Sequence, residues 1–446
     1  MLEAYVNRTP SSRGLWERAR RLFAGGVNHN IRTFGMVTAG AYPPFLSHGK
    51  GSHVWDIDGN EYVDWWMTHY ADILGHSHPV ITKAIRDQAQ KAVHLGGLTG
   101  TQVVFGEAVN DAIPMLELMR FCTTGSEATM YASGIARVFT GRRLIAKAIG
   151  GWHGGNDTLA YHIKHPFADE SLVGGVSFDF NDRESVDAML KTHGHQLAAV
   201  IVEPVLGAGG AIPPEDQFLN YLREETESRD ILLIFDEIVT GFRLAYGDAG
   251  TKVFGVRPDL ITLGKAAGGG MPLGVYGGRE DVMRLAAPGT PGGRWVGGGT
   301  FSSHPLTMAA GTAALGELRR KSDDYRPFNR QGDLFREELN SVFQETGTPA
   351  IATGMGSIVF ITVLRKRLEG THLTGSRLGA AMDNQLQDVF QALLMHHGVL
   401  GYHGLGAMSF AHSRKDLDKT VEGVREAIDS LQKGLMAARS GAGQCP

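Results

Sequence analysis

An apolar run, a lysine and three glycines follow one another in Pro258-Asp259-Leu260-Ile261-Thr262-Leu263-Gly264-Lys265-Ala266-Ala267-Gly268-Gly269-Gly270. The run Leu260–Leu263 predicts a buried strand, and Lys265 comes almost directly after it. The glycines suit a tight turn and a close approach of the backbone to a bound molecule. A lysine in apolar surroundings loses part of its preference for the charged form, so its amine becomes able to attack an aldehyde.

A second apolar run, Ile231–Phe235, ends in Asp236 and Glu237. Lys265 could hold an aldehyde cofactor as a Schiff base, and Asp236 could hold the ring nitrogen of that cofactor. An acidic pair after a strand also occurs in magnesium-dependent nucleotide hydrolases. Those enzymes need a Gly-x-x-x-x-Gly-Lys-Ser/Thr loop, and Lys265 is followed by Ala266. The nucleotide interpretation is therefore disfavoured, and capping of the next helix remains the structural alternative.

Apolar runs alternate with helical patterns through the middle of the chain. The runs that predict buried strands are Leu144–Ala148, Ala198–Val202, Ile231–Phe235 and Leu260–Leu263. A helical pattern such as Phe218–Arg229 lies between two of them. This alternation predicts an α/β fold with a mostly parallel sheet that is covered by helices on both faces.

A helix is expected directly after Thr124, with an apolar stripe at spacings of three and four residues and with Gly141 at its end. The free N–H groups and the positive dipole end at its start make Gly125 and Ser126 a candidate anion site. Taken alone, these residues are more simply explained by an ordinary N-cap at Thr124 or Ser126, because capping is so common.

The composition changes near Lys321–Pro327, where we place a domain boundary. The expected organisation is an N-terminal segment, residues 1–65, that joins a small α+β domain, residues 323–446. Residues 66–322 form the large domain between them.

The bulk composition is that of a packed globular protein. The chain has 446 residues, of which 42% are hydrophobic and 20% charged, and its net charge is −4. This charge argues against nucleic acid or a membrane surface as a partner. Only Cys122 and Cys445 are present, and no apolar stretch is long enough to span a bilayer, so we expect a cytoplasmic protein.

Two further motifs have competing interpretations. Trp152, in Gly151–Gly155, could lie flat on a cofactor ring, or it could be an ordinary core tryptophan. The histidine clusters His76-Ser77-His78, His193-Gly194-His195 and His396-His397 lack the spacing of known metal motifs, so no metal is expected.

Taken in order, these motifs resemble those of class III pyridoxal-phosphate aminotransferases, and most of all those of glutamate-1-semialdehyde 2,1-aminomutase and its aminotransferase relatives. The resemblance covers roughly residues 20 to 310 and continues more weakly to about 435. The matching motifs are Gly25-Gly26-Val27-Asn28 with Arg32, Gly75-His76 with His78-Pro79, Thr124–Ala128, Trp152-His153-Gly154, Val202-Glu203-Pro204, Asp236-Glu237-Ile238 with Thr240–Arg243, Pro258–Lys265 and Gly299–Ser302.

The resemblance implies a fold type I enzyme with pyridoxal 5'-phosphate as its cofactor. It also implies a homodimer in which two chains share each active site. In that family the residue matching Lys265 forms the Schiff base and moves the proton, and the residue matching Asp236 pairs with the pyridine nitrogen.

The remaining roles are implied by the same resemblance. The resemblance implies that Ile238 and Trp152 pack on the two faces of the cofactor ring and that Glu203 and His153 support this ring. It implies that Gly125 and Ser126 bind the phosphate, and that Thr300 reaches the phosphate of the neighbouring subunit. The residues implied for the substrate are Arg32 and His69. Arg32 would receive a substrate carboxylate. Arg243 is a further candidate for the substrate pocket.

Three departures from the aminomutase pattern affect the substrate side. His69 stands where the aminomutase usually has tryptophan, and the stretch Asn156–Asp182 is several residues shorter than its mobile loop. The glutamate-bearing C-terminal segment of the aminomutase is replaced by Gly401–Gly406. A gating loop is the usual device for retaining an intermediate.

We therefore expect a ping-pong aminotransferase that moves an amino group between a carboxylate-bearing amine and a keto acid. Intramolecular transfer by an aminomutase is the alternative. A non-catalytic scaffold relative is a further alternative, which the presence of both Lys265 and Asp236 disfavours.

Overall fold

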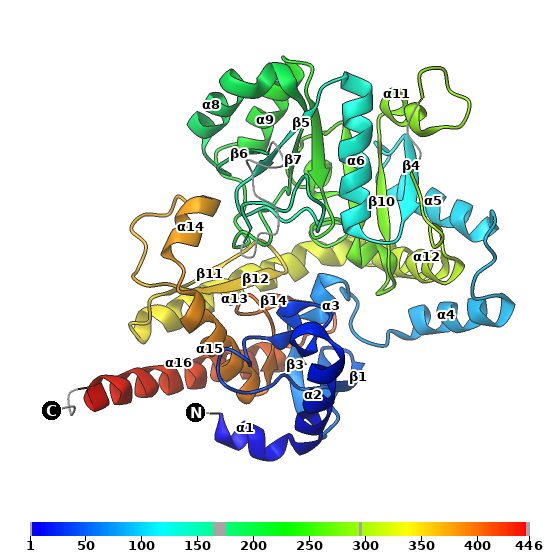
Figure 1. Cartoon of the computed structure of the whole chain (residues 1–446). Coiled ribbons are helices and arrows are strands. Elements are labelled where there is room, and N and C mark those ends of the chain that lie inside the picture. Colours follow the sequence, from blue (N-terminus) through cyan, green and yellow to red (C-terminus); the bar gives the residue numbers. More distant parts are fainter. Residues whose placement is uncertain (1, 164–174, 294–296, 443–446) are drawn as a thin grey trace.

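A seven-stranded sheet forms the centre of the large, upper part of the computed structural model, which describes residues 2–163, 175–293 and 297–442 (Figure 1). Its strands, in spatial order, are β4 (Leu118–Cys122), β10 (Gly274–Gly278), β9 (Leu260–Gly264), β8 (Leu232–Asp236), β7 (Leu197–Val202), β5 (Leu144–Ala148) and β6 (Val176–Phe178). Strand β10 runs antiparallel to both of its neighbours, and the other neighbouring pairs are parallel. The expected α/β fold with a mostly parallel sheet is confirmed.

Strand β8 shows why its sequence is apolar throughout. Leu232 and Ile234 pack in the core beneath α6 (Gly125–Thr140), whereas Leu233 and Phe235 pack in the core on the opposite face. A parallel strand covered on both faces must be apolar at every position. Because side chains alternate along a strand, Asp236 points to the same face as Ile234, the face covered by α6.

The helices of the large sheet region lie between and after the strands. They are α4 (Pro79–Lys91), α5 (Gly100–Ala112), α6 (Gly125–Thr140), α8 (Arg183–His193), α9 (Phe218–Glu227), α10 (Ala249–Lys252), α11 (Glu280–Met283) and α12 (Pro305–Arg320). Helix α12 packs against α4 and α5 on the face away from α6. Both faces of the sheet are thus covered.

Helix α6 begins and ends as its sequence predicts. The hydroxyl of Thr124 accepts the N–H of Glu127, and the carboxylate of Glu127 accepts the N–H of Thr124, which together form a capping box. Gly141 ends the helix in the left-handed conformation, with a φ of 66°. The N-cap is therefore Thr124, and Gly125 and Ser126 are the first two helical residues.

The N-terminal and C-terminal parts of the chain lie together below the large sheet (Figure 1). Strand β13 pairs in parallel with β3, and β12 lies between β11 and β14 in a second small sheet. The strands are β1 (Leu46–Lys50), β2 (His53–Asp56), β3 (Glu61–Asp64), β11 (Ala350–Thr353), β12 (Ile358–Val363), β13 (Val399–Leu400) and β14 (Gly406–Ala407).

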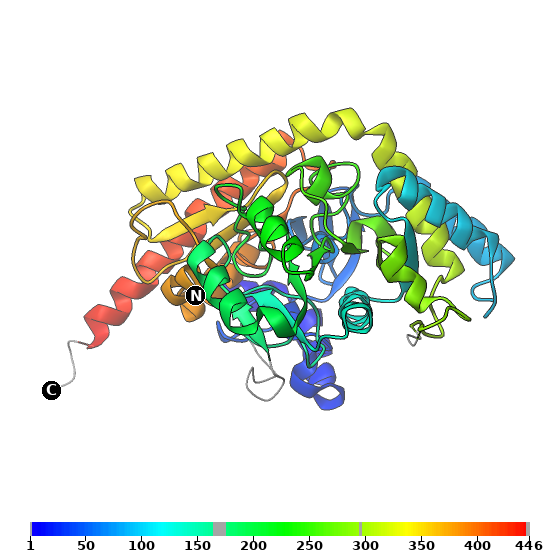
Figure 2. The same cartoon turned by 90° about the horizontal axis from the view of Figure 1, so that it is seen from above.

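Helices cover these small sheets. They are α1 (Glu3–Arg8), α2 (Pro10–Leu22), α3 (Met67–Tyr70), α13 (Tyr325–Glu345), α14 (Gly375–Ala381), α15 (Asn384–His396) and α16 (Arg414–Ala442). Helix α13 follows α12 along one side of the molecule (Figure 2). Across the described ranges, no helix combines the length and the apolar character that a membrane span requires.

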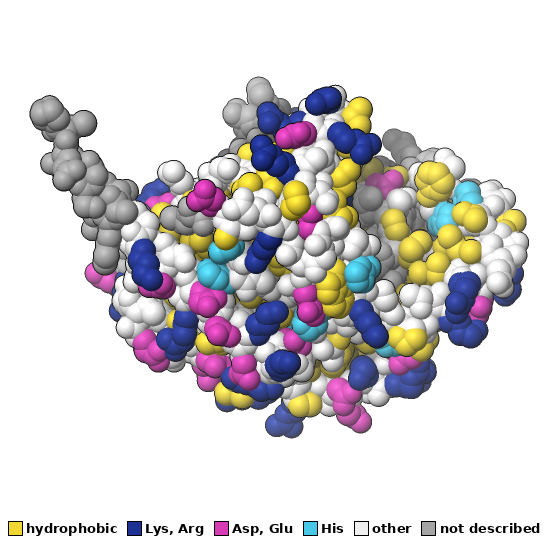
Figure 3. Space-filling view, turned by 90° about the horizontal axis from the view of Figure 1, so that it is seen from below, with side chains coloured by type: hydrophobic (Ala, Val, Ile, Leu, Met, Phe, Trp, Pro, Cys, Tyr) yellow, Lys and Arg dark blue, Asp and Glu magenta, His cyan; other side chains and the backbone are white. Residues whose placement is uncertain are grey.

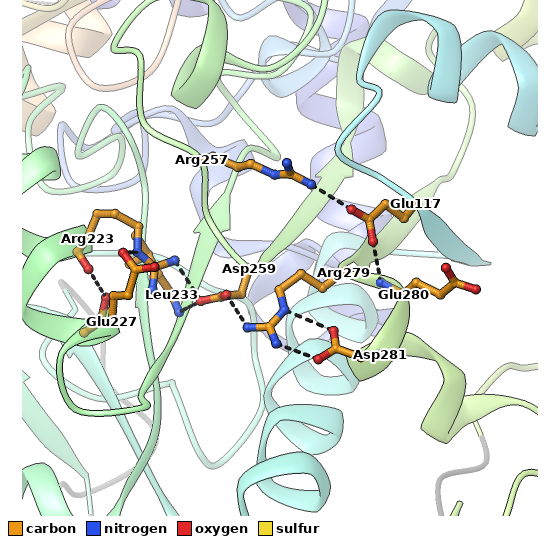
Figure 4. A network of polar contacts seen from close by, with 10 residues as sticks. Glu117, Arg223, Glu227, Leu233, Arg257, Asp259, Arg279, Glu280 and Asp281 are labelled. Carbon is orange, nitrogen blue, oxygen red and sulfur yellow. Dashed lines mark hydrogen bonds and ion pairs between the residues drawn. The ribbon is translucent and has the colours of Figure 1, made fainter.

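Asp259 organises the edge of the large sheet at which β9 begins (Figure 4). Its carboxylate accepts hydrogen bonds from Arg223 and Arg279, each 2.8 Å long, and from the backbone N–H of Leu233. A cavity of about 550 Å³ lies beside these arginines. Since Lys265 follows the other end of β9, this cavity is on the opposite edge of the sheet from the lysine.

Candidate active site

The carboxyl ends of the parallel strands meet at one edge of the sheet. Strand β7 is followed by Glu203, β8 ends in Asp236, and β9 is followed by Lys265. Strand β5 leads into the segment that contains Trp152 and His153. This edge is where open α/β sheets bind their ligands, and it collects most of the predicted cofactor residues.

Lys265 begins the short turn that follows β9 and has a φ of 41°, a left-handed conformation. Burial lowers the pKa of Lys265, although the nearby carboxylates of Asp236 and Glu203 oppose that change. Among the described residues, no hydrogen bond or ion pair involves its amine. Lys265 is half-buried, and its amine is close to acidic groups and uncommitted, which suits a nucleophile that attacks an aldehyde.

Asp236 is buried and is held by three donors. Its Oδ1 accepts the hydroxyl of Thr262 and the backbone N–H of Ile238, both at 3.1 Å. Its Oδ2 lies 2.8 Å from Nδ1 of His153, which we take as the donor because a carboxylate can only accept. Burial lowers the pKa of His153, so its ring is neutral near pH 7. These bonds fix the position of the carboxylate.

Glu237, which follows Asp236 in the sequence, has a structural role. Glu237 is fully buried and accepts the hydroxyl of Thr240 and the backbone N–H of Gly250. It therefore stabilises the loop after β8, as the structural alternative for this acidic pair anticipated.

Glu203 supports the segment that carries Trp152. One of its oxygens accepts the backbone N–H of Trp152 and the other accepts that of Gly207, each at 3.0 Å. Burial and the charge of Asp236 raise the pKa of Glu203 to about 8. The side chain of Trp152 is 37% exposed, so it is no core tryptophan. An exposed ring at this edge is available to cover a bound planar group.

The start of α6 lies against Ile238 and against the loop after His153. A Cβ atom on Gly125 would stand 2.9 Å from Cδ1 of Ile238. The hydroxyl of Ser126 accepts the N–H of Gly155 at 3.3 Å. Any larger side chain at Gly125 would fill the space between helix and ring site, so glycine keeps the helix N-terminus accessible to an anion.

These groups fit pyridoxal phosphate as a set. The cofactor needs an amine for its aldehyde, a carboxylate for its ring nitrogen, an anion site for its phosphate and an apolar surface for its ring. Lys265, Asp236, the N-terminus of α6 and Ile238 can supply these in that order. They come from separate strands and one helix, yet the contacts described above join them at one edge.

The two predicted substrate residues are His69 and Arg32. Burial, with smaller contributions from nearby cationic groups that include Lys265 and Arg32, holds the pKa of His69 well below its usual value. His69 is therefore a neutral ring, and it stacks on Trp66 at 4.4 Å between centroids. Arg32 is exposed, and within the described ranges its guanidinium makes no ion pair.

Thr300 is the predicted site residue that the structure does not connect to the others. It is exposed, and its carbonyl oxygen accepts Nε2 of His94 at 3.0 Å. Two residues before Thr300, the carbonyl oxygen of Gly298 accepts a hydrogen bond from the hydroxyl of Tyr131 on α6. Its assignment to the phosphate of a neighbouring subunit stays a prediction.

Arg243 is not a substrate residue, contrary to expectation. It is fully buried, and its guanidinium donates to the carbonyl oxygens of Tyr70 at 2.7 Å and Met408 at 3.0 Å. Its charge is thus committed to the backbone. Exposure cannot be read from a single sequence position, which is why the motif alone misplaced this arginine.

Two functional neighbours were missed. Thr262 binds Asp236 from within the apolar run of β9, where a polar residue facing the covered side was the available signal. Lys147, inside β5, is fully buried and donates to the carbonyl oxygens of Gly151 and Leu159, which holds the loop before Trp152. Within the part of the chain that the structure describes, no cluster of three or more ligand-type side chains could hold a metal ion.

Comparisons with known proteins agree with this geometry. The family model "Aminotransferase class-III" matches residues 36–400. Glutamate-1-semialdehyde 2,1-aminomutase of Persephonella marina is 36% identical over 434 residues, which cover 94% of this chain and 99% of that protein.

Solved structures give the same result. An omega-transaminase from Sphaerobacter thermophilus is 30% identical, with a TM-score of 0.85 and coverage of 96% of this chain and 99% of that one. A beta-phenylalanine aminotransferase from Variovorax paradoxus is also 30% identical, with a TM-score of 0.84 and coverage of 96% and 95%. Together with the site, these matches show that the chain belongs to the class III aminotransferases, enzymes that use pyridoxal phosphate as their cofactor.

Proposed function

We propose that this chain is an intermolecular aminotransferase that moves an amino group from a carboxylate-bearing amine or amino acid to a keto acid by a ping-pong mechanism. The main support is that two departures from the aminomutase pattern lie on either side of one tryptophan. The ring of His69 stacks on that of Trp66, with 4.4 Å between centroids. The ring of Tyr402, in the replaced segment, lies 5.6 Å from that of Trp66.

These rings give the pocket a substrate wall unlike the one implied by resemblance to the aminomutase, where a tryptophan and a glutamate occupy these places. A changed wall favours a changed substrate, because discrimination depends on the side chains that contact it. The third departure, Asn156–Asp182, falls in part outside the described residues.

When bound, pyridoxal phosphate supplies an aldehyde carbon that exchanges amines and a ring that withdraws electrons. Lys265 would hold that aldehyde through its amine, and the same amine would carry a proton. Asp236 would face the ring nitrogen with a carboxylate that His153, Thr262 and the N–H of Ile238 hold in place. Gly125 and Ser126 would bind the phosphate with backbone N–H groups.

An amino-donor screen tests the proposal. The cofactor-loaded enzyme is incubated with α-amino acids, β-amino acids and ω-amines, with pyruvate or 2-oxoglutarate as acceptor. The range of donors follows from the omega-transaminase and beta-phenylalanine aminotransferase among the solved relatives. We expect amino transfer to an acceptor. Conversion of glutamate-1-semialdehyde without any co-substrate, and no transfer in the screen, would establish the aminomutase instead.

Replacing Arg32 by alanine should raise KM for carboxylate-bearing substrates about ten- to a hundredfold. The reason is that a charge-assisted hydrogen bond of about 1.5–3 kcal/mol is lost. Steady-state kinetics with an amino acid and with the matching amine that lacks the carboxylate measure this effect. Only the amino acid should be affected. The control is Arg18→Ala, another exposed arginine, and an unchanged KM in Arg32→Ala would remove Arg32 from the substrate site.

We further propose a homodimer. Hydrophobic side chains gather beside histidines at the end of the molecule where α4 and α5 lie (Figure 3). Leu95, Leu98, Val103 and Phe301 are between 56% and 92% exposed there. A surface this apolar favours burial against another protein, and the position of Phe301 next to Thr300 suits a shared active site. Light scattering that gave the mass of a single chain at working concentrations would contradict the dimer.

The proposal also includes the domain boundaries and the cellular location. We place the small domain in residues 1–65 and 323–446, supported by the pairing of β13 with β3, and the large domain in residues 66–322. We place the enzyme in the cytoplasm, where its two cysteines would stay reduced.

A further inference from the structure

The four residues of the short element α3, none of them glycine, form a left-handed turn next to the site, not an ordinary right-handed helix. Met67, Thr68, His69 and Tyr70 have φ values of 41°, 49°, 60° and 70°. L-residues avoid this conformation because the Cβ atom approaches the following carbonyl oxygen, and runs of it are rare. Such a turn persists only where its surroundings hold it.

Asp64 holds the beginning of the turn. Its Oδ1 accepts the backbone N–H of Trp66 at 2.8 Å and that of Met67 at 3.2 Å. Asp64 itself is buried at the end of β3, and its own N–H donates to the carbonyl oxygen of Ser52. One oxygen of this carboxylate is therefore used entirely by the turn, and the other is left for a different partner.

That partner is His76. Its Nε2 lies 2.6 Å from Oδ2 of Asp64, and its Nδ1 lies 3.3 Å from Oδ2 of Asp72. Burial disfavours the charged ring, but the two carboxylates outweigh it and raise the pKa of His76 to about 10. The imidazolium thus bridges the acidic residues before and after the turn. The backbone of His76 is fixed as well, by a reciprocal pair of hydrogen bonds with Gly51.

The other end of the turn is held by Arg243, whose Nη2 donates to the carbonyl oxygen of Tyr70 at 2.7 Å. The Tyr70 ring stacks on Phe360. Asp72 also lies against the glycines after Lys265, since a Cβ atom on Gly270 would stand 3.0 Å from its Oδ1. Asp72, which is paired with His76, therefore contacts the backbone that follows Lys265.

The turn presents His69 to the substrate side of the site. The ring of His69 lies 4.4 Å from that of Trp66, 5.4 Å from that of Tyr70 and 6.1 Å from that of His29, between centroids. No hydrogen bond of the described residues holds this ring. Its direction is set by the backbone of the turn and by stacking alone.

We propose that His76, through Asp64, is a positioning residue that holds the left-handed turn and thereby fixes His69 in the substrate pocket. This inference rests on the proposed role of His69 as a substrate residue. Its structural half, that His76 holds the turn, can be tested independently of the reaction.

Hydrogen–deuterium exchange of the cofactor-loaded full chain tests the structural half. In His76→Gln, peptides that cover residues 65–72 should exchange at least about tenfold faster, because Asp64 loses a charged partner. Peptides from α6 should not change. The matched control is His397→Gln, which removes another histidine–carboxylate pair, 2.8 Å from Glu426. Unchanged exchange in residues 65–72 of His76→Gln would overturn the proposal.

A double-mutant cycle tests the functional half. With a donor that the wild-type enzyme accepts, His76→Gln should lower kcat/KM about ten- to a hundredfold, chiefly through KM. In a His69→Ala background, His76→Gln should have little further effect, because both changes act through the same ring. Independent, multiplying effects would overturn the functional half. If exchange is faster in His76→Gln but the two substitutions act independently on kcat/KM, then His76 holds the turn but does not act on the substrate through His69. Failure of the donor screen leaves the exchange result intact, so the two proposals fail separately.

Discussion

Lys265→Ala is expected to abolish turnover, with kcat reduced by at least about 10⁴-fold, because the variant loses both the covalent attachment and the proton carrier. Cofactor binding should largely survive, since Asp236 and the start of α6 remain. Steady-state kinetics and the visible absorbance of the purified protein measure the two effects. Borohydride reduction of the wild-type enzyme, followed by peptide mapping, should place the label on Lys265.

The control for this variant is Lys252→Ala, an exposed lysine at the end of α10. It should retain wild-type kinetics. Normal turnover in Lys265→Ala, or a borohydride label on a different lysine, would refute the role of Lys265. A colourless protein from cofactor-rich cells would favour a scaffold without catalysis.

Asp236→Asn is expected to lower kcat/KM by about 10²–10³-fold while the fold is kept. Asparagine has the same shape and can still accept the hydroxyl of Thr262 and the N–H of Ile238. It lacks the negative charge that, in our proposal, would pair with the ring nitrogen of the cofactor, and a fixed charge at the reacting group has an effect of this size. Kinetics of the variant, with its absorbance spectrum to confirm cofactor binding, provide the measurement.

Glu237→Gln is the matched control for Asp236→Asn. The two carboxylates are adjacent in sequence and both are buried, but that of Glu237 faces Thr240 and Gly250. A glutamine there can keep one acceptor oxygen, so activity should stay close to that of the wild type. Equal losses in both variants would indicate that the loop after β8, and not the charge of Asp236, is what matters.

Local patterns were enough to predict strands β5, β7, β8 and β9 of the large sheet and the limits of helix α6. The runs that became β8 and β9 are apolar at consecutive positions because helices cover both faces, and their ends place Asp236 and Lys265 at one edge. Thr124 and Gly141 marked the limits of α6 by capping chemistry that involves only a few neighbouring residues.

Features that depend on distant contacts could not be predicted in this way. Strand β10 contains Gly274, Gly277 and Gly278, which typically mark a turn. A Cβ atom on Gly274 would stand 2.2 Å from the carbonyl oxygen of Thr124, so glycine is needed where β10 passes the start of α6. Arg243 was misplaced for a related reason, because its acceptors are carbonyl oxygens that lie more than a hundred residues away in the chain.

The left-handed turn gave little local signal, because neither glycine, asparagine nor aspartate occurs among Met67–Tyr70, and His69 is the one residue of a type enriched in this conformation. At about 1–2 kcal/mol for each residue, its conformation costs several kcal/mol. A typical domain has a net stability of only about 5–15 kcal/mol. Selection for heat tolerance would therefore favour glycine at the exposed position Thr68. The same replacement would loosen the turn that we propose positions His69 in the substrate pocket, so stability to heat and substrate selectivity would place opposite demands on this one residue.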